Sequence, residues 1–404
     1  MHLLYLTQYY VTEDQPGSIR HHQHARHLIE NGHRVTVVSA FITHAERAIP
    51  PGFEGQKIHV EQRGNLTIYK TYASPGYKRT IASRLQNYLT FMFYSFIAGL
   101  RVRDIDLILA SINPISVGVV GWLLSALNRV PFILEVCDLS ADSAEALQVV
   151  RSKWFIRLVR RIETFLFRRA TRVIVLTKGI GRAVEEAGVS CERIAFVPMG
   201  VDIDLIEPAA KGGIRKNDHE FIAIYVGTFS TYASLETILL AAERLKSCLD
   251  IRFVFVGGGD QRGHIESLVR QLDLHNVTIH GVVPKRHVHA ILTEANVCIL
   301  PYRDIDLFRG ALPNKLFDYL GSGRPVIAAV RRGEVTSIIE ESGAGLCIGP
   351  ERPAELVGAV LWVYNHPEEA RGMGVKGRQY VIRHFDRKKI MDRYLKLLEE
   401  VTAS

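Results

Sequence analysis

The sequence is poor in cysteine and contains no paired-cysteine motif. Its five cysteines lie far apart, their number is odd, and no Cys-x-x-Cys occurs. A disulfide scaffold or a zinc ribbon needs cysteines at characteristic close spacings. We therefore exclude both classes and expect a chain that folds in a reducing compartment.

Long apolar runs are also missing. Residues 1–10 lack the basic start and the apolar stretch of a secretory signal, so we expect none. The longest uncharged apolar run, Leu85–Leu100, is too short for a clear membrane span. No repeat with a period of roughly 20 to 50 residues is visible, which argues against a solenoid or a propeller.

The chain does contain enough apolar material for two domains of ordinary size. It has 404 residues, of which 47% are hydrophobic and 23% are charged. Its formal net charge of +8 favours an anionic partner, which is a nucleotide, an acidic membrane or a nucleic acid. No nucleic-acid recognition motif accompanies this charge, so we expect no nucleic-acid partner.

Short apolar strands alternate with helices in both halves of the sequence. The main expected strands are residues 2–7, 34–39, 106–111, 131–136, 172–177, 194–197, 221–226, 251–256, 277–281, 297–300 and 326–330. The main expected helices are residues 19–30, 77–103, 117–127, 151–172, 235–247, 264–272, 286–294, 354–365 and 387–401. This alternation predicts α/β domains with parallel sheets. The polar segment 207–219 is the expected linker.

One helix start carries two polar residues in an otherwise plain segment. Pro313 and Asn314 suit a helix N-terminus, and Lys315 lies in the first turn, where free N–H groups and the helix dipole favour a phosphate. Asp318 lies about one turn further along, on the same face as Lys315 or near it. Two interpretations remain open: a grip on a nucleotide diphosphate and its ribose, or an internal Lys–Asp pair.

Other candidate residues follow strand ends, where open α/β sheets bind their ligands. Gly17 and Ser18 precede the first helix, and Asp138 follows the strand at 131–136. A plain turn explains Gly17 and Ser18 at least as well, and an N-cap explains Asp138 equally well. The glycines at 257–259 allow a ligand close to the backbone, but they are weak evidence alone.

Two patterns resemble metal sites without completing one. His21, His22, His24 and His27 crowd the first helix, but no nearby cysteine or paired carboxylate joins them. The segment Asp304-Ile-Asp306 has the Asp-x-Asp spacing but lies in an ordinary loop. We expect no metal and no cofactor.

The segment 151–172 is basic and aromatic together. A helix of this kind can lie on an anionic membrane surface, or it can be a core helix with a solvated outer face. For the apolar helix at 77–103, burial in a core is the ordinary interpretation, and a surface near a lipid acceptor is the rarer one. We expect a cytoplasmic protein, peripheral on the inner face of the cell membrane if 151–172 binds lipid.

Several motifs, in their order and spacing, resemble those of retaining glycosyltransferases of family 4. They are Gly32–Val37, Val197–Asp202, Tyr225–Gly227, Val256–Asp260, Gly281–Pro284 and Val297–Pro301. Two further segments, Pro131–Leu139 and Pro313–Tyr319, are most similar to the branch that adds amino sugars to precursors of bacterial surface polysaccharides.

The resemblance implies the GT-B fold, with two Rossmann-like parallel-sheet domains facing an interdomain cleft. An acceptor-binding domain would span residues 1–206 and a domain for the nucleotide sugar residues 207–384, while the helix at 385–404 would pack back on the first domain. The implied activity is transfer of an N-acetylhexosamine-like sugar, with retention, from a UDP-sugar to a lipid-linked carbohydrate acceptor. A sugar-nucleotide epimerase of the same architecture is the alternative.

The resemblance also implies which residues form the site. The donor nucleotide would contact Gly227, Thr228, Gly258, Gly259, Val283, Arg309, Asn314, Lys315, Leu316 and Asp318. Asp138 would orient or deprotonate the acceptor, with Glu135 as the second catalytic residue. Gly17 and Ser18 would approach the phosphates.

The sequence departs from the family pattern at several of these positions. Gly310 stands at the first of the family's two glutamates and Asp318 at the second. Thr228 stands at one of the usual phosphate-binding positions, and Cys137 replaces the usual histidine before Asp138. We therefore expect Lys315 and the helix amides, rather than a metal, to stabilise the leaving diphosphate.

Overall fold

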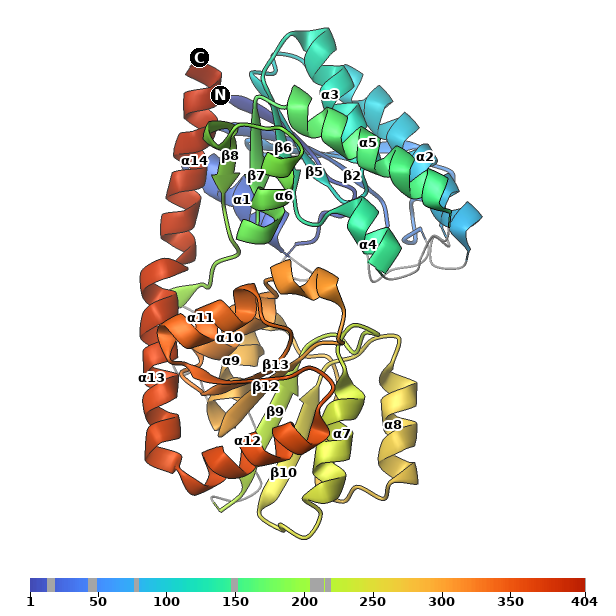
Figure 1. Cartoon of the computed structure of the whole chain (residues 1–404). Coiled ribbons are helices and arrows are strands. Elements are labelled where there is room, and N and C mark those ends of the chain that lie inside the picture. The colour runs from blue at the N-terminus through green and yellow to red at the C-terminus, as the bar shows by residue number, and fades with distance from the viewer. Residues whose placement is uncertain are drawn as a thin grey trace. The chain divides into compact units, whose positions relative to one another are not determined.

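The chain folds into two compact units, each built on its own sheet. The computed structural model describes residues 1–12, 19–42, 49–75, 80–146, 152–203, 214 and 219–403. The first unit comprises Met1–Val197 and Met391–Ser404, and the second comprises Pro198–Ile390 (Figure 1). The expected boundary between residues 206 and 207 lies outside the described residues, whereas the division by contacts falls at Pro198.

The first unit contains an eight-stranded sheet in the order β3-β4-β2-β1-β5-β6-β7-β8. All of its neighbouring strands are parallel except β3 and β4, which form an antiparallel hairpin. The strands are β1 (His2–Leu6), β2 (Arg34–Ala40), β3 (Ile58–Arg63), β4 (Leu66–Thr71), β5 (Leu107–Ile112), β6 (Phe132–Val136), β7 (Arg172–Val175) and β8 (Ile194–Phe196).

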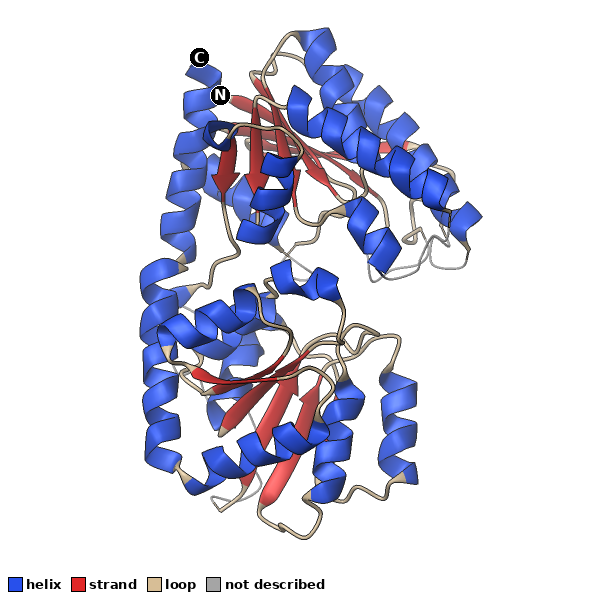
Figure 2. Cartoon of the chain, viewed as in Figure 1, coloured by secondary structure: helices blue, strands red, loops and turns tan. Residues whose placement is uncertain are grey.

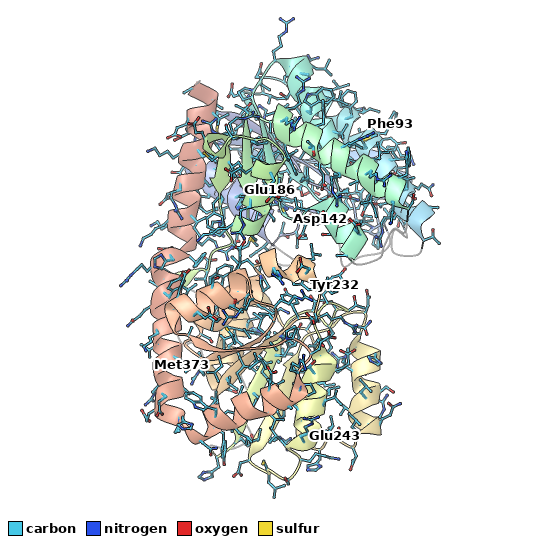
Figure 3. All side chains as sticks on the ribbon, in the orientation of Figure 1. Phe93, Asp142, Glu186, Tyr232, Glu243 and Met373 are labelled. Carbon is cyan, nitrogen blue, oxygen red and sulfur yellow. The ribbon has the colours of Figure 1, made fainter. Side chains whose placement is uncertain are left out.

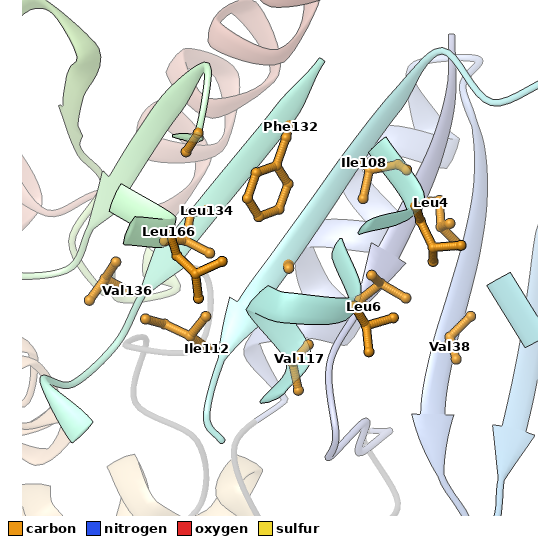
Figure 4. Close-up of a cluster of buried hydrophobic side chains, with 14 of the residues drawn as sticks. Leu4, Leu6, Val38, Ile108, Ile112, Val117, Phe132, Leu134, Val136 and Leu166 are labelled. Carbon is orange, nitrogen blue, oxygen red and sulfur yellow. The ribbon is translucent and has the colours of Figure 1, made fainter. Parts of the chain in front are cut away.

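Helices cover this sheet on both faces (Figure 2). The helices of the first unit are α1 (Arg20–Glu30), α2 (Ile81–Leu100), α3 (Ser116–Asn128), α4 (Ser140–Ala146), α5 (Lys153–Arg169) and α6 (Lys178–Glu186), with the short η1 (Cys191–Arg193). Because successive strand residues point to opposite faces, Leu4 and Leu6 join the core under α2, α3 and α5 (Figure 4). Tyr5, between them, contacts His21 of α1 on the other face.

The last helix, α14 (Arg387–Ala403), contacts α1 through His24 and His27, and the turn after α1 through His33. The rings of His24 and Tyr394 lie 4.6 Å apart, and the imidazoles of His27 and His33 lie 3.3 Å and 3.2 Å from carboxylates of α14. Tyr394 and Leu398 are buried. These contacts account for the placement of residues from Met391 onward in the first unit.

The second unit contains a six-stranded, wholly parallel sheet in the order β11-β10-β9-β12-β13-β14. Its strands are β9 (Phe221–Val226), β10 (Ile251–Val256), β11 (Val277–His280), β12 (Val297–Pro301), β13 (Val326–Ala329) and β14 (Gly345–Ile348). One face packs against α7 (Leu235–Arg244), α8 (Arg262–Gln271) and α12 (Pro353–Asn365), and the other against α9 (Lys285–Glu294), α10 (Asn314–Gly321), α11 (Glu334–Ser342) and α13 (Pro367–His384).

Three helices differ from the sequence-based expectation. The segments 334–342 and 367–384 were not expected as helices, yet α11 and α13 fill them. The helix expected over 77–103 is α2, and it is not buried all round, because Leu85, Leu89 and Phe93 are exposed. Within the part of the chain that the structure describes, no helix has both the length and the apolar composition to cross a bilayer.

Candidate functional site

The first turn of α10 lies beside the carboxyl end of β9. Lys315 Nζ donates a hydrogen bond to the Tyr225 hydroxyl (2.7 Å) and lies 4.4 Å from the centre of the Tyr225 ring. A Cβ built on Gly227 would lie 3.0 Å from this Nζ, and the φ of Gly227 is +151°. Glycine at 227 therefore lets the lysine ammonium reach the strand end.

A buried tyrosine holds α10 in this position. The Tyr319 hydroxyl accepts a hydrogen bond from the Val226 N–H (2.8 Å) and donates one to the Val226 carbonyl (3.1 Å). The pairing of β9 with β12 reaches only Ile224, so the hydroxyl takes the place of a strand neighbour for Val226. Lys315 lies four residues before Tyr319 and hence on the same helix face.

The turns after β9 and β10 touch each other. The φ of Gly257 is +146°, and a Cβ built there would lie 2.0 Å from the Gly227 carbonyl oxygen. Thr228 is exposed, and its carbonyl accepts a hydrogen bond from the Tyr225 hydroxyl (2.7 Å). Three expected donor-site residues from two segments, Gly227, Thr228 and Lys315, thus come together around one tyrosine.

The neighbouring loops bring two more of the expected residues close to these turns. The Phe229 N–H donates to the Gly258 carbonyl (2.8 Å), and a Cβ on Gly259 would lie 2.5 Å from the Phe229 carbonyl oxygen. A Cβ on Gly258 would lie 3.0 Å from Val282 Cγ2, in the residue before Val283. Val283 itself is half-buried against the core.

The Lys315 ammonium lies in a poorly hydrated place. Loss of water around the side chain lowers the pKa of Lys315 to about 8. The group is therefore mostly charged at neutral pH, and it attracts an anion that approaches it. A diphosphate is such an anion, and the first-turn amides of α10 add hydrogen-bond donors.

Asp318 points to a different partner from Lys315. Its carboxylate forms an ion pair with Lys285 at the start of α9, and His289 Nε2 lies 3.8 Å from its other oxygen. Among the described residues, no ion pair joins Lys315 and Asp318. The interpretation of an internal Lys–Asp pair is therefore wrong, because each side chain has its own partner on another element.

Three other residues were expected to contact the sugar donor: Arg309, Asn314 and Leu316. Arg309, in η3 (Asp306–Gly310), pairs with Asp306 at 2.7 Å. Asn314 is exposed as the first residue of α10. The Leu316 side chain is fully buried, and its N–H donates to the Pro313 carbonyl (3.0 Å); its expected contact with the donor stays a prediction.

In the first unit, Glu135 lies at the centre of a buried polar network. Its carboxylate accepts hydrogen bonds from Arg20 Nη2 (2.6 Å) and from the Tyr5 hydroxyl (3.3 Å). The same Arg20 nitrogen lies 3.0 Å from Cys137 Sγ, and burial raises the pKa of the Cys137 thiol. Glu135 is fully buried and links α1 to β6 through Arg20, and its expected catalytic role stays a prediction.

Asp138 lies beyond this network and is exposed. The protein around it still limits its hydration, and this desolvation raises the pKa of Asp138 to about 6 despite the nearby Arg20, which acts in the opposite direction. A carboxyl with this pKa can exchange a proton near neutral pH. The expected phosphate-loop residues Gly17 and Ser18 lie outside the described residues.

The two metal-like patterns have other partners in the structure. His21 Nδ1 lies 2.5 Å from the Tyr5 hydroxyl, and His22 Nδ1 lies 3.1 Å from the Tyr10 hydroxyl. Asp304 and Asp306 both pair with Arg331. Across the described residues, no group of three or more His, Cys, Asp or Glu side chains is arranged to hold a metal ion.

Comparison with known proteins identifies the family. Residues 18–200 match the model of a glycosyl transferase 4-like domain, and residues 207–380 match the model of glycosyl transferases group 1. The chain belongs to the group 1 glycosyltransferases. A related protein over nearly its whole length is a putative colanic acid biosynthesis glycosyl transferase, WcaI, of Escherichia coli, with 21% identity over 91% of this chain and 92% of that protein. The α-D-kanosaminyltransferase of Streptomyces kanamyceticus is 24% identical over 61% of this chain and 64% of that protein.

Solved structures share the fold of this group 1 glycosyltransferase. Sucrose-phosphate synthase from Thermosynechococcus elongatus has a TM-score of 0.76 at 19% identity, covering 100% of this chain and 99% of that one. Anabaena HepE in complex with UDP-glucose has a TM-score of 0.73 at 16% identity, covering 99% and 100%. The predicted α/β fold class, two Rossmann-like domains of the GT-B type, is confirmed.

Sequence reasoning missed the partners that position this glycosyltransferase's site. Tyr225 and Tyr319 lie at the ends of two of the family-like segments, but neither was singled out as a site residue, since each reads simply as an aromatic residue beside apolar ones. Lys285 and His289 offered a weak signal, because they follow Pro284 with the one-turn spacing of a shared helix face. Only the packing of α9 against α10 shows that both reach Asp318.

Proposed function

We propose that this glycosyltransferase moves an N-acetylhexosamine-like sugar, with retention, from a UDP-sugar to a carbohydrate acceptor on a lipid-linked precursor of a cell-surface polysaccharide. The observation that carries the proposal is the poorly hydrated Lys315 ammonium at the N-terminus of α10, beside the glycine turns that follow β9 and β10. The names of relatives support it: two are named as putative colanic acid biosynthesis glycosyltransferases, and HepE was solved with UDP and UDP-glucose.

The donor would bind in the second unit through its diphosphate and its ribose. The amides of α10 and Lys315 would take the diphosphate, because both are donors of the first helical turn and Lys315 reaches the end of β9. Asp318, one turn further along α10, would accept hydrogen bonds from the ribose hydroxyls. Gly258, Gly259 and Val283 would allow the base close to the backbone.

Transfer would break the bond between the anomeric carbon and the diphosphate oxygen and form a bond to the acceptor oxygen on the same face. UDP leaves with the electron pair of the broken bond, and Lys315 stabilises the charge that develops on it. The acceptor hydroxyl loses its proton, and Asp138 is our candidate to orient that hydroxyl or to receive the proton. No metal takes part in this scheme.

A panel of nucleotide sugars tests the proposal. Purified protein is incubated with each UDP-sugar and a lipid-linked acceptor extract, and both UDP release and the glycosylated product are measured. We expect product with at least one UDP-sugar and loss of product in Lys315→Met and Asp318→Ala. Full activity in both variants would exclude the nucleotide site. An isomerised nucleotide sugar formed without acceptor would instead indicate an epimerase.

We also propose that this enzyme is cytoplasmic and contacts the inner face of the membrane through α2 and α5. The side chains of Trp154 (68% exposed), Leu158 and Phe165 form an apolar stripe on α5 at helical spacing. Exposed basic residues flank the stripe: Lys153, Arg157, Arg161 and Arg169. Basic groups beside exposed aromatic side chains complement an anionic lipid surface.

The exposed face of α2 extends this apolar surface. Leu85, Leu89 and Phe93 follow one another at four-residue spacing, and Phe93 is 58% exposed (Figure 3). Helix α3 lies between α2 and α5 and contacts both, so the two stripes belong to one helical layer (Figure 1). A surface of this kind would bring the enzyme to a lipid-linked acceptor.

Vesicle sedimentation tests the membrane contact. We expect binding to phosphatidylglycerol vesicles that falls with salt, weak binding to phosphatidylcholine vesicles, and loss of binding in Phe93→Gln/Trp154→Gln. Leu249→Gln is the matched control, because Leu249 is an exposed apolar residue in the second unit. Equal binding by the double variant and the control would exclude this surface.

A further inference from the structure

The two oxygens of the Asp318 carboxylate face two residues of α9 that differ in exposure. Lys285 pairs with Oδ2, and His289 Nε2 lies 3.8 Å from Oδ1. The side chain of Asp318 is 14% exposed, that of Lys285 is 44% exposed and that of His289 is 4% exposed. One partner thus lies at the surface and the other lies in the interior.

This difference makes only one of the two contacts displaceable. Lys285 is the first residue of α9, and its ammonium ends a flexible four-carbon chain that can turn to water. His289 is held one turn further along by the surrounding core and cannot move away without opening it. The 3.8 Å between His289 Nε2 and Asp318 Oδ1 is longer than a hydrogen bond. A small shift of the carboxylate would bring the two atoms within hydrogen-bond distance.

We propose that Lys285 is a displaceable cover on Asp318, occupying in the free enzyme the oxygen that the donor's ribose hydroxyls take, and that His289 is a positioning residue that keeps the carboxylate turned toward the ribose. This inference rests on the proposed function, in which Asp318 binds the ribose. Nucleotide binding then exchanges one partner of Asp318 for another, while His289 stays in place.

If Lys285 covers Asp318, removal of the lysine charge should change the affinity for nucleotide in the opposite direction to the usual one. Loss of a lysine near an anion normally weakens nucleotide binding. Here Lys285→Gln removes a competitor for Asp318, and exposed ion pairs of this kind correspond to about a 2- to 5-fold change in an equilibrium constant. We therefore expect UDP to bind Lys285→Gln about 2- to 5-fold more tightly than it binds the wild type.

Two probes isolate the ribose contribution. The dissociation constants of UDP and of 2′,3′-dideoxy-UDP are measured by calorimetry. The constant for 2′,3′-dideoxy-UDP divided by the constant for UDP reports the ribose hydroxyls alone, because the diphosphate contacts cancel. The ratio should exceed 1 in the wild type, collapse in Asp318→Ala and rise in Lys285→Gln. Lys396→Gln breaks another exposed lysine–carboxylate pair, with Glu400, and should leave the ratio unchanged.

The role of His289 is tested by a conservative pair of variants. His289→Leu removes both ring nitrogens, so it should reduce the ratio, whereas His289→Gln can present an amide N–H near the Nε2 position and should restore most of it. Melting temperatures confirm that both variants are folded. Equal ratios for both variants and the wild type would show that His289 only packs in the core, and would overturn its positioning role.

Failure of this inference is distinct from failure of the proposed function. If the wild-type ratio is 1 and Asp318→Ala binds UDP normally, the ribose site itself is wrong. If that ratio is large and lost in Asp318→Ala, but Lys285→Gln binds UDP equally or more weakly, the site stands and the cover is overturned.

Discussion

At the scale of single residues, the titration of Lys315 gives the site a measurable signature. Its pKa is lowered to about 8 by burial, so the ammonium is present below pH 8 and is lost above it. UDP affinity should therefore fall between about pH 7.5 and 9.5, over which the charge disappears. Lys315→Met should bind UDP roughly 10- to 100-fold more weakly and show no such fall.

Calorimetry of UDP binding across that pH range checks this prediction. Lys376→Gln is the control, because it removes one exposed lysine charge from the second unit. It should keep the wild-type pH dependence. A wild-type affinity that stays constant to pH 9.5 would mean that no lysine near its titration point holds the diphosphate.

Asp138 gives a second signature at the opposite end of the pH range. Desolvation raises the pKa of Asp138 to about 6, so the carboxylate that accepts a proton is lost as the pH falls below 6. The transfer rate kcat should rise with pH and level off above about 6. Asp138→Asn should lower kcat by roughly 100- to 10,000-fold and leave a flat profile over this range.

Initial rates from pH 5 to 8 at saturating donor measure this profile. UDP binding in Asp138→Asn should match the wild type, because the proposed nucleotide contacts lie in the second unit. A variant that retains the rise near pH 6 would assign the titration to another group.

At the scale of elements, the position of α10 depends on one hydroxyl. Tyr319→Phe leaves the N–H and the carbonyl of Val226 without the partner that ends the β9 pairing. Loss of these buried hydrogen bonds should reduce the free energy of unfolding by about 1–3 kcal/mol. Because Lys315 lies on the same helix, the KM for the donor should rise as well.

Urea unfolding and donor kinetics test this prediction together. Tyr364→Phe is the control, since the Tyr364 side chain is 39% exposed and lies on α12. Its unfolding free energy should change by less than about 0.5 kcal/mol. Unchanged stability and KM in Tyr319→Phe would show that α10 is held by its apolar face alone.

Most elements of this fold were predictable because large apolar side chains mark them. The strands near 2–7, 221–226 and 251–256 are apolar runs, and they form the centres of the two sheets. Helix α13 escaped prediction because it buries small residues, including Gly374 and Gly377, rather than a large apolar stripe. A Cβ on Gly374 would lie 2.0 Å from the Gly323 carbonyl oxygen, so close packing explains the glycine.

The candidate site was predictable only in part, for a related reason. Lys315 and Asp318 stand out locally, because they are the charged residues of an otherwise plain helix start. Their partners Tyr225, Lys285 and His289 come from segments 29 to 90 residues away, as the contacts 289–318, 285–318 and 225–315 lie across different elements. Local sequence patterns carry no information on such pairings, which sheet order and helix packing decide.

At the scale of the whole molecule, two separate cores predict a divided response to nucleotide. The buried apolar clusters of the first unit and the second unit share no residues, and the proposed contacts of the nucleotide lie in the second unit. A ligand at 100 times its dissociation constant stabilises the unit that binds it by about 2.7 kcal/mol. Amides that exchange only when the second unit unfolds should therefore be protected by roughly 100-fold.

Native-state hydrogen exchange with and without UDP measures this response. Peptides from β9, β10 and α10 should exchange more slowly with UDP, and peptides from the central strands β1, β2 and β5 should change far less, since no proposed nucleotide contact lies on them. Lys315→Met at the same UDP concentration should reduce the protection in the second unit. Protection confined to the first unit would relocate the nucleotide and remove the assignment of α10 as its binding helix.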